Sequence, residues 1–126
     1  MGINIMEISD QQFEAWISEA IDRLPKDFLD KTNNVAFLFA DQPTPEQLKK
    51  IQLRPGMTLY GLYEGYHQAT RKNIGPVLPD RITLFKKSFS DARSEEEAKE
   101  RIYRTIKHEI AHHFGSDEPG ARKAGR

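Results

Sequence analysis

The feature that most restricts the fold of this chain is a run of apolar residues at four-residue spacing near its C-terminal end. The run consists of Ala98, Ile102, Ile106, Ile110 and Phe114. Because residues four apart share one face of an α-helix, the pattern predicts a helix of about five to six turns with one buried stripe. Ser94 and Glu97 form a capping box at its start, and Gly115 stands where a left-handed C-terminal cap belongs.

A second amphipathic helix is predicted near the N-terminus. Apolar residues recur at steps of three and four between Phe13 and Leu24, as they do on the core-facing side of a helix. Ser9 and Gln12 have the spacing of a capping box before this segment, and Pro25 closes it.

Three segments between these helices have the composition of β-strands. Residues 35 to 40 form a short apolar run that predicts a buried strand in the centre of a sheet, and residues 57 to 63 and 81 to 85 predict two more strands. A short helix is expected over residues 44 to 51, and residues 64 to 80 form a long connection that is either functional or a disordered surface loop. The expected fold is therefore α+β, with a short, mostly antiparallel or mixed sheet packed on the N-terminal and C-terminal helices.

Length, charge and composition exclude several classes of function. The 126 residues suit a single domain, residues 1 to 126. Nineteen basic residues balance nineteen acidic ones, so no nucleic-acid partner is expected. No segment is long and apolar enough to span a membrane and no signal peptide is evident, which predicts a cytoplasmic protein; the oligomeric state is not indicated. Because the chain contains no cysteine, any metal must be bound by His, Asp or Glu.

The C-terminal helix contains an H-E-x-x-H motif, from His108 through Glu109 to His112. The two histidines are four residues apart, so both imidazoles project from one side of the helix and can bind one ion, for which zinc is suited. They lie away from the isoleucine stripe, and Glu109 falls between the stripe and the ligands. That position suits a general base that acts on a zinc-activated water.

A catalytic zinc site usually has a third protein ligand. The motif continues as H-E-x-x-H-x-x-G-x-x-E, in which Gly115 lets the backbone reverse so that Glu118 can swing back toward the metal. Glu118 is the preferred third ligand and Asp117 the alternative, while an exposed acidic turn would involve neither. A later helix bearing a distant glutamate is not expected, because few residues follow.

Two other histidines attract attention without belonging to the motif. His113 lies near the Ile106 side of the helical wheel, which favours a packed, hydrogen-bonded core histidine over a ligand. His67 lies in the long connection, where an exposed histidine is favoured over an oxyanion-stabilising group. Tyr63 is expected to be structural.

These residues resemble a family of small bacterial zincin-like metallopeptidases, which carry H-E-x-x-H-x-x-G-x-x-D near the C-terminus. Residues 61 to 65, 79 to 85 and 108 to 115 look like the family's successive signature blocks, and residues 13 to 25 are similar too. The resemblance implies a compact α+β domain with two histidine ligands, a catalytic glutamate and an acidic third ligand. The family's aspartate position falls on Glu118 by direct counting, and on Asp117 only after a one-residue deletion.

The sequence thus predicts a zinc-dependent metallopeptidase that hydrolyses a peptide or protein substrate. Glu109 would deprotonate the water and then protonate the leaving amine. The strand at residues 81 to 85, or whichever strand forms the sheet edge beside the metal, would hold an extended peptide by strand addition. The alternatives are a zinc hydrolase acting on a non-peptide substrate, and an inactive, metal-stabilised binding domain.

Overall fold

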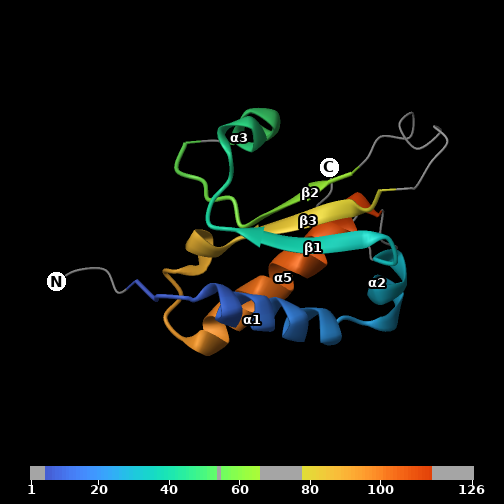
Figure 1. Ribbon diagram of the computed structural model, residues 1–126, viewed down its shortest axis with the longest axis horizontal. Helices are drawn as coiled ribbons and strands as arrows, with labels where there is room; N and C mark the ends of the chain where they lie inside the picture. Colours follow the sequence, from blue (N-terminus) through green and yellow to red (C-terminus); the bar gives the residue numbers. More distant parts are fainter. Residues whose placement is uncertain (1–4, 54, 66–77, 115–126) are drawn as a thin grey trace.

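The computed structural model describes residues 5–53, 55–65 and 78–114. In chain order they form α1 (Asp10–Asp22), α2 (Lys26–Lys31), β1 (Val35–Ala40), α3 (Pro45–Ile51), β2 (Gly61–Glu64), β3 (Asp80–Phe85), the 3-10 helix η1 (Lys86–Phe89) and α5 (Glu95–His113). Helices α1 and α5 lie side by side on one face of the sheet, and α3 lies on the opposite side (Figure 1). This arrangement confirms the predicted α+β class and the packing of the sheet on the two long helices.

The sheet is mixed and has the strand order β1-β3-β2. Strand β1 pairs parallel with β3, and β2 pairs antiparallel with β3. The prediction that residues 35 to 40 form the central strand is wrong, because β3 occupies the centre and β1 has one partner among the described residues. The physical reason is visible in the burial of the side chains: Leu38 of β1 is 43% exposed, whereas Ile82 through Phe85 of β3 are all buried.

Strand β2 is shorter than predicted, since it begins at Gly61 rather than at residue 57. The preceding residues are nevertheless held to their neighbours. The hydroxyl of Ser88 donates to the carbonyl of Leu59 at 2.7 Å, and the amide of Phe85 donates to the carbonyl of Tyr60 at 3.0 Å. Two short helices, α2 and η1, have no counterpart in the prediction.

The core lies between the two long helices and the inner face of the sheet. The stripe of α5 is buried as predicted, with Ala98, Ile102, Ile106 and Ile110 all fully covered. Aromatic and aliphatic residues of α1 and the sheet complete the core, among them Phe13, Trp16, Ile17, Ile82, Leu84 and Phe89. The core therefore fixes the rotation of α5 about its own axis.

The predicted helix starts are correct, although the capping contacts differ in detail. The Ser9 hydroxyl accepts from the amide of Gln12, and Thr44 and Gln47 form a complete capping box. At α5 the Ser94 hydroxyl accepts from the amide of Glu97 at 3.1 Å, but the Glu97 carboxylate accepts from the amide of Arg93 instead of that of Ser94. No helix in the described ranges is long and apolar enough to cross a membrane.

Candidate metal centre and the adjoining groove

His108 and His112 lie on the exposed side of α5, opposite the isoleucine stripe. Their imidazole rings are nearly parallel, with an interplanar angle of 14° and 6.0 Å between ring centroids. The helix thus presents both rings side by side, as the motif spacing predicts.

The donor set of these two residues suits zinc. Two imidazole nitrogens bound to one tetrahedral zinc at about 2.0 to 2.1 Å hold their ring centroids about 5 Å apart. The separation of 6.0 Å between the rings of His108 and His112 is close to that value, and a modest rotation of the exposed side chains covers the difference. Neutral imidazole is also among the ligands that zinc prefers.

The described residues bring no third ligand to this pair, since no group of three or more metal-binding side chains is found in residues 5–53, 55–65 and 78–114. Both sequence-predicted third ligands, Glu118 and Asp117, lie outside the described residues, as do Gly115 and His67. Of the candidate ligands, the structure therefore describes His108 and His112 alone.

Glu109 follows His108 on α5 and is largely covered, with 16% of its side chain exposed. Its Oε1 lies 3.5 Å from Nε2 of His113, one helical turn further along. Such i,i+4 pairs restrict the side chains of both residues. The carboxylate is therefore held beside His113 and does not extend freely into solvent.

His113 does not lie in the core, so the reading of it as a packed core histidine is wrong. Its side chain is 35% exposed, and its ring stacks on Tyr63 of β2 at 4.4 Å between centroids with an interplanar angle of 12°. The Tyr63 hydroxyl in turn donates to Asp80 of β3, and the ring of Tyr63 meets Phe114 edge-on. The helical wheel missed this contact because it describes α5 alone and not the strand that passes over its end.

Strand β2 comes close to α5 at Gly61. A Cβ atom built on Gly61 would lie 2.8 Å from Cγ2 of Thr105 and 2.9 Å from Cδ2 of Leu84. Both distances are well inside ordinary carbon contacts of about 3.5 to 4.0 Å. A glycine is thus required here so that the strand can lie against the helix that carries the motif.

A groove runs between β2 and α5 at this crossing. One hollow of about 300 Å³ is lined by residues 58 to 61 on the strand side and by Arg104, Thr105, His108 and Glu109 on the helix side. A second hollow of about 250 Å³ shares Tyr60, Arg104 and Thr105 with the first and extends to Arg101. The two hollows are together called the β2–α5 groove hereafter, and His108 and Glu109 are its lining residues nearest the C-terminal end of α5.

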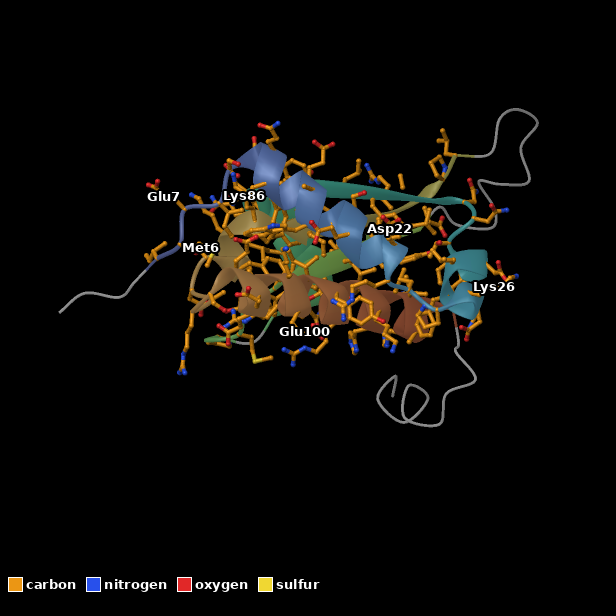
Figure 2. The ribbon with its side chains drawn as sticks, turned by 90° about the horizontal axis from the view of Figure 1, so that it is seen from below. Met6, Glu7, Asp22, Lys26, Lys86 and Glu100 are labelled. Atoms are coloured by element: carbon orange, nitrogen blue, oxygen red, sulfur yellow. The ribbon has the colours of Figure 1, made fainter. Side chains whose placement is uncertain are left out.

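A separate hollow of about 620 Å³ lies by the start of α1 and contains none of the motif residues. Met6 and Lys86, which line it, are labelled in Figure 2 beside the first turn of α1. The Lys86 ammonium lies 2.6 Å from a carboxylate oxygen of Asp10 and 3.5 Å from one of Asp41. The hydrogen bond to Asp10 raises the pKa of Lys86 above its usual value.

Comparison with known proteins agrees with this geometry. The sequence model of the zincin-like metallopeptidase family matches residues 32–124, which is most of the chain. No curated protein matches. The structure of a conserved hypothetical protein from T. thermophilus superimposes on this chain with a TM-score of 0.55 at 21% sequence identity. The match covers 85% of this chain and 94% of that chain, and it shows that the two proteins share a fold. The chain belongs to the family of zincin-like metallopeptidases.

Proposed function

We propose that this protein is a zinc-dependent peptidase, with His108 and His112 as zinc ligands and Glu109 as the general base. Glu118, in preference to Asp117, would be the third ligand. The observation that carries the proposal is the arrangement of the motif side chains at the β2–α5 groove. The two imidazoles are exposed and side by side, and the intervening carboxylate is largely covered and lines the groove.

The residues of the chain have distinct tasks in this mechanism. When bound, zinc supplies a Lewis acid that lowers the pKa of a water toward about 7 and polarises the substrate carbonyl. The Glu109 carboxylate accepts the proton of that water on one of its oxygens and delivers it to the leaving amine nitrogen, so the general base becomes the general acid. Its low exposure keeps the carboxylate in one place between these two transfers.

The sheet edge that lies beside the motif helix is that of β2 and not that of β3. The predicted edge role of residues 81 to 85 is wrong because β3 is paired on both sides. In the antiparallel register, the bond from the amide of Phe85 to the carbonyl of Tyr60 places the main-chain groups of Gly61 on the opposite edge of β2. Among the described residues no strand pairs with that edge, so we propose that the peptide adds there.

The decisive experiment replaces Glu109 by Gln, with Glu96→Gln as a matched control. Glu96 is an exposed residue in the first turn of the same helix, with no ion pair among the described residues. Glu109→Gln should retain about one zinc per chain while hydrolysis of a peptide library falls at least ~100-fold, because the proton acceptor is lost.

Zinc content is measured by mass spectrometry and cleavage by peptide mapping, on both variants and the parent protein. A Glu109→Gln protein that still cleaves peptides at the parent rate would refute its role as the general base. A parent protein that binds zinc and hydrolyses esters but no peptide would point to the non-peptide hydrolase instead. A parent protein that hydrolyses neither would point to the inactive binding domain.

A further inference from the structure

Arg104 differs from the other basic residues of α5 in its surroundings. Lys99 pairs with Glu19 and Glu95, and the guanidinium of Arg101 lies 2.7 Å from a carboxylate oxygen of Asp91. Lys107 lies over the rings of Phe28 and Tyr103. Within the described part of the chain, Arg104 is the α5 cation for which no carboxylate or aromatic partner is found.

The position of Arg104 places its positive charge at the β2–α5 groove. Arg104 lines both hollows of the β2–α5 groove. It precedes His108 by one helical turn, so the two residues lie on the same side of α5, about 6 Å apart along its axis. An exposed guanidinium therefore stands in the groove a short distance from the proposed reaction centre.

The orientation of β2 relative to α5 indicates which end of a bound peptide meets this charge. Gly61 lies against Thr105, and Tyr63 lies against His113, so strand and helix run in the same direction. A peptide added antiparallel to β2, the more frequent pairing, would run the opposite way. Its residues after the scissile bond would then lie toward Arg104.

From this geometry we infer that the groove selects substrates with a carboxylate about two residues C-terminal to the scissile bond, bound by Arg104. An extended chain advances about 3.3 Å per residue, so two residues span the ~6 Å between the levels of His108 and Arg104. The planar guanidinium suits a carboxylate in a bidentate pair. Either an Asp or Glu side chain or the free C-terminal carboxylate of a peptide provides that chemistry. The inference rests on the proposed peptidase function and names its substrate class.

The first experiment maps cleavage sites in a peptide library for the zinc-loaded parent protein and three variants. The variants are Arg104→Gln, Arg104→Glu and, as the matched control, Arg93→Gln, which removes an exposed arginine outside the groove. The parent and the control should show a threefold to fivefold enrichment of acidic residues at the second position after the cut, the size of an exposed ion pair. Arg104→Gln should lose this enrichment, and Arg104→Glu should favour Lys and Arg there.

The second experiment measures binding without hydrolysis, in the Glu109→Gln background. Dansyl-labelled hexapeptides of Ala and Leu carry one Glu, Gln or Lys at the fifth residue, each with a free or an amidated C-terminus. Glu peptides should bind threefold to fivefold more tightly than Gln peptides, and this ratio should shrink as salt is raised and vanish in Arg104→Gln. A preference that follows the free C-terminus instead of the Glu would identify the terminal carboxylate as the ligand.

The outcomes separate the two proposals. Cleavage with no acidic preference, or a preference that survives Arg104→Gln, overturns the inference on Arg104 and leaves the peptidase standing. Binding that depends on charge and on Arg104, in a protein that cleaves no peptide, supports the contact of Arg104 with a carboxylate and overturns both the peptidase and the assignment of that carboxylate to a position after a scissile bond.

Discussion

Replacing Gly61 by alanine tests whether the strand must lie against the motif helix as closely as the structure indicates. The added methyl would lie 2.8 Å from Cγ2 of Thr105 and 2.9 Å from Cδ2 of Leu84. Relieving these contacts to about 3.5 to 4.0 Å requires a displacement of roughly 0.7 to 1 Å. Thr105 has little freedom to recede, because it is β-branched on a helix and its hydroxyl donates to the carbonyl of Arg101 at 2.8 Å.

The expected cost follows from two opposing contributions. Overpacking of this kind destabilises proteins by about 1 to 3 kcal/mol, and replacing glycine by alanine recovers about 0.4 to 1 kcal/mol through the unfolded chain. The free energy of unfolding should therefore fall by about 1 to 2 kcal/mol, which lowers Tm by roughly 3 to 10 °C in a chain of this size. Urea unfolding followed by tryptophan fluorescence suits the measurement, since Trp16 is the one tryptophan and is 4% exposed.

A second variant decides whether the contact with Thr105 causes the loss. Thr105→Ser removes Cγ2 and keeps the hydroxyl, so Gly61→Ala combined with Thr105→Ser should recover at least ~0.5 kcal/mol relative to additivity. Gly56→Ala is the matched control, because Gly56 has a φ of +84° with no atom within 4 Å of the added methyl. It should cost about 1 kcal/mol through backbone strain and gain nothing from Thr105→Ser. A stable Gly61→Ala, or a double variant without coupling, would refute the close approach.

Two further predictions concern contacts at opposite ends of the molecule. His113→Phe keeps a ring to stack on Tyr63 but removes the nitrogen beside Glu109. Zinc content and KM should therefore be unchanged, while kcat of peptide cleavage should fall about tenfold. An unchanged kcat would show that His113 does not position the Glu109 carboxylate. The pKa of Lys86 is raised mainly by its hydrogen bond to Asp10. The charged Lys86 ammonium therefore contributes to the free energy of unfolding at neutral pH, and this contribution is lost as the pH rises through the pKa of Lys86 in the folded protein. The stability difference between the parent and Lys86→Met, from urea midpoints, should therefore shrink above about pH 10.4; a difference that grows with pH would contradict the pairing.

Helices α1, α3 and α5 were predictable because their signals are local, whereas the short helices α2 and η1 were not predicted. Caps at Ser9, Thr44 and Ser94 lie within a few residues of the amides that they accept from, and the stripe of α5 repeats at the helical period. The place of β1 in the sheet was not predictable in the same way, because an apolar run specifies burial and not the number of neighbouring strands. β3, which the composition did not distinguish from β2, took the centre because both neighbouring strands pair with it.

The candidate site also combines features that the sequence predicts with features that it does not. The spacing of His108 and His112 is a property of one helix, and the sequence alone placed both rings on one side of it. The partner of His113 is Tyr63, 50 residues earlier in the chain, and Arg104 lines a groove only because β2 passes opposite it. No local pattern carries these contacts, since they depend on where the strand crosses the helix.

The isoleucine stripe and the H-E-x-x-H motif share one helix and one spacing, and this couples the core to the site. Ile106 and Ile110 are fully buried, and each precedes a motif histidine by two residues, or about 200° around the helix axis. Burial of the stripe therefore turns both imidazoles outward. The opposite face of the groove is set by Gly61, which lets β2 contact the same helix. In this way the packing that holds the fold together also turns the two imidazoles outward and forms the groove beside them.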